Sequence, residues 1–174
     1  MGTFGNTTQG THTGYMNANW LQGSPFTSPS DASGATIDKV SAYCTENKSG
    51  DMYGKAVIVL DSTGEIITNG VSDPSLIPTS VQWVDFTFST PPEIEANTSY
   101  ILMMIVDSGS FECQYYYLNN DNITYLDLSN NYTTPTDPDI DEGTEINISI
   151  YATYSGGGGG GPEDSSSFTF SQIL

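Results

Sequence analysis

The sequence predicts an all-β protein: a two-sheet antiparallel β-sandwich, jelly-roll-like, with a C-terminal extra strand on a glycine linker. Segments with alternating apolar and polar residues recur along the chain, and turn-forming residues separate them at intervals of roughly 10 residues. No segment shows the apolar spacing of an amphipathic helix. About eight strands of this kind favour a jelly roll over a seven-stranded immunoglobulin sandwich.

The first 17 residues are rich in Gly, Thr and Asn and show little periodicity, so we expect an irregular N-terminal segment over 1–17. The sandwich domain is predicted to span 18–155, and its first strand candidate is 19–27.

Three segments, 35–46, 80–90 and 145–154, alternate between an apolar and a more polar face, as half-buried strands do. The positions predicted to face inward are Val40, Ala42 and Cys44; Val84, Phe86 and Phe88; and Ile146, Ile148, Ile150 and Ala152. The positions predicted to face outward are Lys39, Ser41 and Tyr43; Trp83, Asp85 and Thr87; and Asn147, Ser149, Tyr151 and Thr153.

The remaining strand candidates follow the same logic. Residues 54–70 read as a hairpin, because β-branched runs flank the turn sequence DSTG at 61–64. Residues 98–109 are apolar on both faces, which is typical of a central strand. Shorter strands are predicted within 111–119 and 123–129.

One block resembles a known family. It reads W-x-x-F-x-F, then a short spacer, an aliphatic residue and A-x-T-x-Y-x-L, at Trp83, Phe86, Phe88, Ile94, Ala96, Thr98, Tyr100 and Leu102. With KAVIVLDSTGEII before it and SIYATY after it, the block resembles non-catalytic jelly-roll modules of surface proteins, of phage virion and tail proteins, and of glycosidase-associated proteins. The resemblance covers about residues 18–154. It implies an adhesive, structural or carbohydrate-binding role and carries over no catalytic residue.

The charge balance limits the partners. The chain of 174 residues has 21 acidic residues against three lysines and no arginine, a formal net charge of −18. Such a surface repels nucleic acids and anionic membranes and attracts divalent cations. No apolar run is long enough to span a membrane, and the first residues lack the regions of a signal peptide. We therefore expect a mature form or a protein assembled without secretion, as virion proteins are.

Catalytic motifs are missing from the sequence. His12 is the only histidine and falls in the N-terminal segment, and there is no nucleophile elbow, phosphate-binding loop or His/Cys metal cluster. Carboxylates are plentiful, but no pair is singled out for glycoside hydrolysis. We expect no enzyme activity and no required cofactor.

An acidic segment, TDPDIDEGTE, is a candidate calcium site, because calcium prefers several oxygen ligands from one loop. Its spacing does not match an EF-hand, and a solvated acidic loop is the alternative. The candidate ligands are Asp137, Asp139, Asp141, Glu142 and Glu145.

Exposed aromatic side chains are the candidate platform for sugars, and packing in the core or at edges is the alternative. The run Tyr115–Tyr117 must point to both faces if it forms a strand, so at least one member is predicted in the core. We expect Tyr116, Tyr125 and Tyr132 to cluster on one surface. The candidate ligand-binding residues are Trp20, Trp83, Tyr116, Tyr125 and Tyr132.

Cys44 and Cys113 both fall in predicted strands, and they form either one disulfide or two buried free thiols. The disulfide is favoured because the rest of the composition looks extracellular, and glycosylation motifs contribute to that interpretation. The N-x-[ST] glycosylation motif occurs six times, at Asn6, Asn47, Asn97, Asn122, Asn131 and Asn147.

The end of the chain predicts strand addition. A Gly/Ser-rich linker over 156–167 precedes a candidate donor strand, 168–174, in which Phe168, Phe170 and Ile173 are the apolar positions. Six glycines span about 13 Å on average and about 20 Å when stretched. The strand then pairs with its own domain, begins a further module, or joins the sheet of a neighbouring subunit.

These features favour a non-enzymatic structural subunit of an extracellular filament or a virion surface, a homopolymer linked by strand addition. The alternative is a carbohydrate-binding or adhesive module that recognises surface glycans. Either role places the protein outside the cell, on a cell surface or on a virion.

Overall fold

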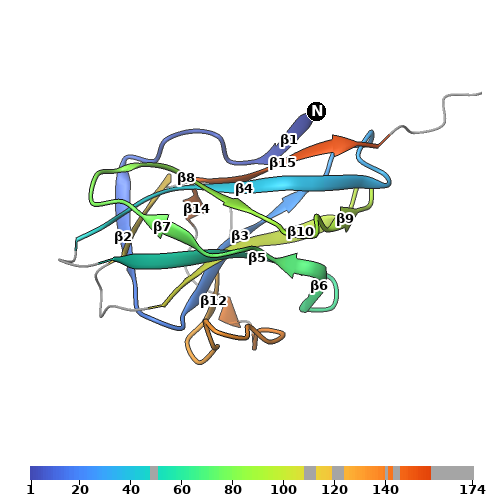
Figure 1. The fold of residues 1–174 in the computed structure, drawn as a ribbon. Helices are drawn as coiled ribbons and strands as arrows, with labels where there is room; N and C mark the ends of the chain where they lie inside the picture. Colours follow the sequence, from blue (N-terminus) through green and yellow to red (C-terminus); the bar gives the residue numbers. More distant parts are fainter. Residues whose placement is uncertain (48–50, 108–112, 119–123, 140, 143–145, 158–174) are drawn as a thin grey trace, which may run out of the picture.

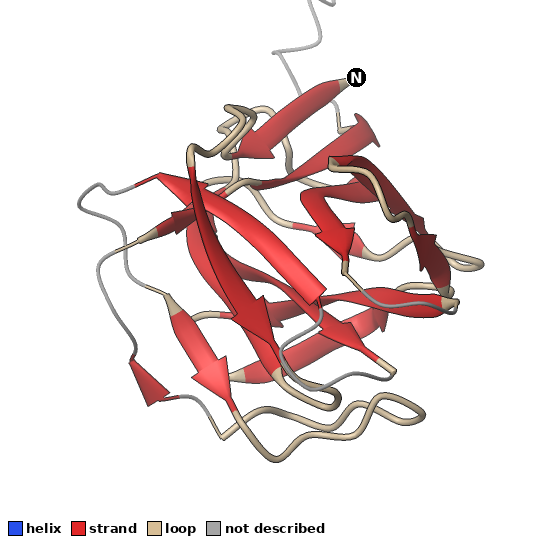
Figure 2. Cartoon of the chain, turned by 90° about the vertical axis from the view of Figure 1, so that its left-hand side faces the viewer, coloured by secondary structure: helices blue, strands red, loops and turns tan. Residues whose placement is uncertain are grey.

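The computed structural model describes residues 1–47, 51–107, 113–118, 124–139, 141–142 and 146–157. This part of the chain is all-β, and two antiparallel sheets pack against each other (Figures 1 and 2). The predicted two-sheet sandwich is confirmed. The described residues form no helix, so they include none that is long and apolar enough to cross a membrane.

The two sheets have eight and seven strands. Sheet A contains β1 (Gly2–Gly5), β2 (His12–Met16), β4 (Ala35–Glu46), β8 (Gln82–Thr87), β9 (Glu93–Ile94), β11 (Cys113–Leu118), β14 (Asn147–Ile148) and β15 (Ile150–Gly156). Sheet B contains β3 (Leu21–Thr27), β5 (Met52–Leu60), β6 (Glu65–Val71), β7 (Ser75–Ile77), β10 (Ser99–Val106), β12 (Tyr125–Asp127) and β13 (Asp141–Glu142).

The main strands alternate between the sheets along the chain. Strands β3, β5, β10 and β12 lie in sheet B, and β4, β8, β11 and β15 lie in sheet A. Each predicted strand region contains one of these strands, and the predicted hairpin is β5–β6. Its turn is closed by the Gly64 amide, which donates to the carbonyl of Leu60 at 2.9 Å, and Gly64 adopts a φ of 74° that favours glycine.

The main core lies between the sheets, where the predicted inward positions are found. Val40, Phe86 and Ile150 have no exposed surface, and the other predicted inward residues are at most 8% exposed. The period-two pattern therefore assigned the inward positions of β4, β8 and β15 correctly. Of the positions predicted to face outward, Ser41, Ser149 and Thr153 are buried as well.

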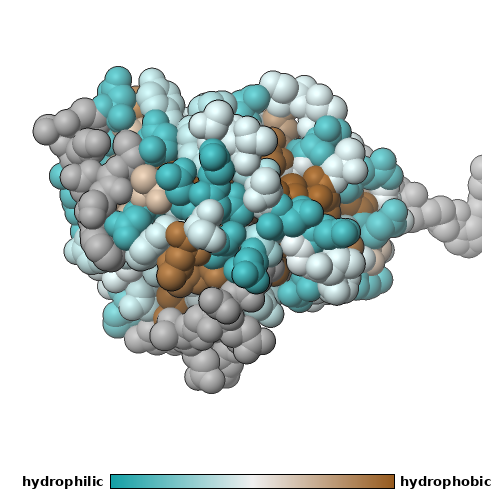
Figure 3. Space-filling view, turned by 90° about the horizontal axis from the view of Figure 1, so that it is seen from below, coloured by the Kyte–Doolittle hydropathy of each residue, from teal (hydrophilic) through white to brown (hydrophobic). Residues whose placement is uncertain are grey.

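A second, smaller apolar cluster lies on the outer face of sheet B. It explains why β10 is apolar on both faces, since its alternate residues Ile101, Met103 and Ile105 belong to this cluster rather than to the main core. Tyr125 and Tyr132 pack against the cluster. Figure 3, which views the molecule from the side of β12, shows hydrophobic areas set among hydrophilic ones.

Lys55 on β5 binds the segment that contains Tyr132 and Thr133 to sheet B. Its ammonium donates to the carbonyl oxygens of Tyr132 at 2.9 Å and Thr133 at 3.3 Å, and lies 4.6 Å from the centre of the Tyr132 ring. The arrangement combines hydrogen bonds with a cation–π contact. The outer face of sheet B is thus partly covered by the chain itself.

The expected irregular N-terminal segment is wrong in two places, because β1 pairs with β15 and β2 pairs with β11. Backbone hydrogen bonds hold these two strands in the sheet. Their sequences therefore lack the alternating apolar pattern from which a strand is predicted. Glycines create room for aromatic rings of the partner strands: a side chain at Gly2 or Gly14 would collide with the ring of Tyr154 or Tyr115. The sandwich therefore begins near residue 2 rather than at 18. Most of the linker and the whole candidate donor strand lie outside the described residues.

Candidate functional site

Four aromatic side chains meet on the outer face of sheet A, one from each of four strands. They form a chain of ring contacts, which we name the aromatic row. The ring centroids are 5.2 Å apart for Tyr116 and Tyr43, 5.3 Å for Tyr43 and Trp83, and 5.0 Å for Trp83 and Tyr151. All four side chains are partly exposed.

Strand register produces this row. Tyr43 on β4 is the direct partner of Trp83 on β8, and Tyr151 on β15 is the partner of Ser41. On the edge of β4 opposite β8, the edge that β11 shares with β15, the pairing of Cys44 with Tyr115 of β11 places Tyr116 beside Tyr43. Since β8 and β11 flank β4, the row crosses two strand spacings, about 10 Å.

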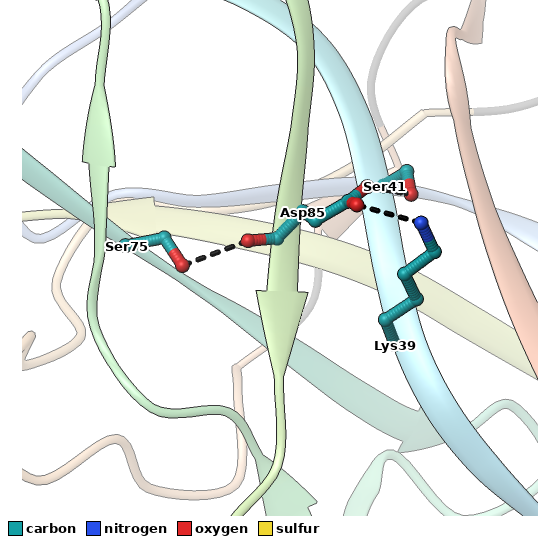
Figure 4. A network of polar contacts seen from close by, with 4 residues as sticks. All are labelled: Lys39, Ser41, Ser75 and Asp85. Atoms are coloured by element: carbon teal, nitrogen blue, oxygen red, sulfur yellow. Dashed lines mark hydrogen bonds and ion pairs between the residues drawn. The ribbon is translucent and has the colours of Figure 1, made fainter.

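A polar network adjoins the row on the same face. Asp85 accepts hydrogen bonds from the Lys39 ammonium and the Ser41 hydroxyl, each at 2.6 Å. The Ser75 hydroxyl donates to the backbone carbonyl of Asp85 at 2.8 Å (Figure 4). Ser41 is the β4 partner of both Asp85 and Tyr151, so the network and the row share this stretch of the sheet.

Hydrogen bonding sets the protonation of the pair. Partial burial alone raises the pKa of Asp85, but the hydrogen bonds from Lys39 and Ser41 outweigh burial, and the pKa is lowered. The hydrogen bond to Asp85 raises the pKa of Lys39. Both groups are therefore charged across the neutral range.

The chemistry of this face suits hydroxylated rings. Aromatic rings present a negative π-face on which the C–H groups of a sugar ring can stack. A carboxylate has lone pairs for about four hydrogen bonds, and Asp85 uses two of its acceptor positions on Lys39 and Ser41. Stacking surface and hydroxyl acceptor therefore lie on one face.

The predicted ligand-binding residues divide among three places. Trp83 and Tyr116 belong to the aromatic row, and Trp20 is half-buried between β2 and β3. Tyr125 and Tyr132 pack against the outer cluster of sheet B. The expected clustering of Tyr116 with those two tyrosines is wrong, because β11 and β12 belong to different sheets.

Sequence reasoning missed Tyr43 and Tyr151 as site residues. Both stood at outward positions of alternating strands, which was the available signal. The run 115–117 behaves as predicted, since Tyr115 is 6% exposed and Tyr116 points to the opposite face.

The predicted calcium ligands are only partly described. Asp137 accepts a hydrogen bond from the Ile66 amide at 2.8 Å, and Asp139 is exposed. The side chains of Asp141 and Glu142, and residue Glu145, lie outside the described part of the chain. Among the side chains that are described, no group of three His, Cys, Asp or Glu residues is arranged to hold a metal ion.

Cys44 and Cys113 are free, buried thiols, the second of the two alternatives left open. Burial raises the pKa of both, with a further contribution from Cys113 at Cys44 and from Glu46 at Cys113, whose pKa rises to about 12. Protonated thiols of this kind are poor nucleophiles.

The glycosylation motifs differ in access. Asn6 is 8% exposed, and its amide donates to the carbonyl oxygen of Asn147 at 3.3 Å while its side-chain oxygen accepts from the Thr8 amide. Asn147 is itself partly buried in β14. Exposed motif asparagines are Asn47, Asn97 and Asn131, and Asn122 lies outside the described residues.

A cavity of about 580 Å³ lies where β6 approaches the segment around β9. Its lining mixes apolar side chains with carboxylates, and includes Leu60, Glu65, Ile66, Ile67, Glu93 and Glu95. None of these residues was a sequence candidate, and none belongs to the aromatic row.

Comparison with known proteins adds no assignment. No family model matches the chain, and no similar sequence was found among curated proteins.

Proposed function

We propose that this protein is a non-catalytic binding module that recognises carbohydrate through the aromatic row, and that it needs no cofactor to do so. The observation that supports the proposal is the row itself, together with the carboxylate of Asp85 beside it. Binding sites of this kind combine aromatic surface with a few fixed polar groups.

Packing of the sandwich does not account for the row. Neither the main core nor the outer cluster of sheet B includes Tyr43, Trp83, Tyr116 or Tyr151. Aromatic pairs on a sheet surface do stabilise it modestly. A chain of three contacts across four strands is nonetheless more aromatic surface than a solvated face requires, which favours a ligand.

The test is a glycan array followed by calorimetry with the best ligand. Trp83→Ala and Tyr116→Ala should abolish or strongly weaken binding, because each removes a ring of the row. Tyr53→Ala is the matched control, since Tyr53 is a 39% exposed tyrosine on β5 of the other sheet. Silence of the folded wild-type protein across the array, or equal loss in all three variants, would refute the proposal.

Assembly by strand addition is the second candidate. The tail 168–174 has an alternating aromatic pattern after a glycine linker, and among the described strands β1 pairs on one side only, with β15. A neighbouring subunit would then accept the tail at such an edge, in a filament or on a virion surface outside the cell. Deletion of residues 156–174 should abolish polymers seen by negative-stain microscopy and size-exclusion chromatography while leaving glycan binding intact. A wild-type protein that remains monomeric would exclude this role.

A further inference from the structure

We infer that the ligand of the aromatic row is an uncharged glycan of at least two sugar units, and that Asp85 is the residue that selects for it. The inference rests on the proposed carbohydrate-binding function and specifies its substrate class.

Positive charge is scarce in this protein. The chain has three lysines and no arginine, against 21 acidic residues. Lys39 is engaged by Asp85 at 2.6 Å, and Lys55 lies on sheet B, where it binds the segment of Tyr132. Lys48 lies outside the described residues. On the described outer face of sheet A, no lysine or arginine side chain beyond Lys39 is present to pair with the carboxylate or sulfate of an acidic sugar.

Lys39 is already paired with a carboxylate that an acidic ligand would approach. The Lys39 and Asp85 side chains are 34% and 47% exposed, so solvent and ligand can reach the pair. The Lys39 ammonium keeps N–H donors beyond the one that Asp85 engages, but an acidic sugar bound there would bring its own charge beside the Asp85 carboxylate. Like charges at such a distance repel, and the net charge of −18 adds to the repulsion. A neutral sugar meets no such obstacle.

Asp85 provides a charged hydrogen-bond acceptor for a sugar hydroxyl group. Its two oxygens are fixed by Lys39 and Ser41, and its backbone carbonyl accepts from Ser75. The carboxylate is therefore held in one orientation, with lone pairs left over. Sugar hydroxyls are donors, and hydrogen bonds to a charged acceptor are among the stronger ones. Asp85 can thus accept a hydrogen bond from a sugar hydroxyl at the position where it would repel the carboxylate of an acidic sugar.

The geometry of the row sets the minimum ligand size. Its rings extend from β8 across β4 to β11, about 10 Å, which exceeds a single sugar ring. A ligand that contacts both Trp83 and Tyr116 must therefore be an oligosaccharide that runs across the strands.

The experiment uses an array that carries neutral glycans alongside sialylated, uronic and sulfated ones, followed by calorimetry at low and high salt. We expect neutral hits, an affinity that changes less than about twofold with salt because no ion pair forms, and a loss of about tenfold in Asp85→Asn. Asp61→Asn is the matched control, since Asp61 also accepts a serine hydroxyl bond but follows β5 of sheet B. Thermal melting of both variants checks that they are folded.

The outcomes separate the two proposals. Binding of acidic glycans that Trp83→Ala abolishes would overturn the present inference and leave the proposed function standing. Unchanged affinity in Asp85→Asn would overturn the selecting role of Asp85. No glycan binding at all would overturn both.

Discussion

Tyr43 and Trp83 face each other as register partners on neighbouring strands, with ring centroids 5.3 Å apart, on the solvent side of a sheet whose opposite side is the main core. Each of these residues also contacts a second aromatic ring, so the pair is the centre of the aromatic row.

Trp83→Ala should lower the free energy of unfolding by about 1–3 kcal/mol, because it removes two aromatic contacts of about 0.5–1.5 kcal/mol each. Tyr116→Ala removes one such contact and should cost about half as much. Urea unfolding of both variants measures the difference. A loss above about 4 kcal/mol in Trp83→Ala would show that the ring belongs to the core, contrary to its partial exposure.

The ion pair of Lys39 and Asp85 predicts a bell-shaped pH dependence of its contribution to stability. The lowered pKa of Asp85 makes its contribution present above the ordinary value of 3.8 and lost as the pH falls through the lower folded value. The raised pKa of Lys39 makes its contribution present below the ordinary value of 10.5 and lost as the pH rises through the higher folded value.

The measurement is the difference in unfolding free energy between wild type and Asp85→Asn across this pH range. Because the pair is partly exposed, the plateau should be about 0.5 kcal/mol, and added salt should reduce it. A difference that stays constant down to the acid limit would mean that Asp85 contributes through packing alone.

The two cysteines should resist thiol reagents in the folded protein. Cys44 and Cys113 have no exposed surface, and burial raises the pKa of both thiols. We expect DTNB to label neither in native buffer and both after denaturation without a reductant. Labelling of neither after denaturation would reveal a disulfide, and fast labelling of the native protein would contradict the buried position.

A substitution of Asp137 can distinguish its predicted role as a calcium ligand from a role in stabilising the fold. Its carboxylate already accepts the Ile66 amide at 2.8 Å, so Asp137→Ala should destabilise the protein by about 1–2 kcal/mol in calcium-free buffer. Thermal melts of wild type and variant, with calcium and with chelator, measure this. If the variant differs from wild type only when calcium is present, Asp137 acts as a metal ligand.

The sequence was sufficient to predict which face of each main strand points into the core, but not which strands lie side by side. The alternation around Val40, Phe86 and Ile150 predicted the buried side correctly, because burial depends on local period. The contact of Tyr43 with Trp83 and Tyr116 depends on which strands flank β4 and in what register, and these pairings join residues distant in the chain. The strands β1 and β2 were missed for a related reason, since backbone pairing to β15 and β11 holds them without any periodic apolar pattern.

The outer cluster of sheet B determines which face of the sandwich can tolerate amino-acid substitutions. Residues such as Val57, Ile101 and Met103 are buried beneath Tyr125 and Tyr132, so a substitution on that face disturbs packing and is constrained by folding. The row residues on sheet A lie outside both apolar clusters, and exchange of their side chains leaves those clusters intact. Mutational tolerance is therefore concentrated on one side of the sandwich, where new specificities can arise at modest cost in stability.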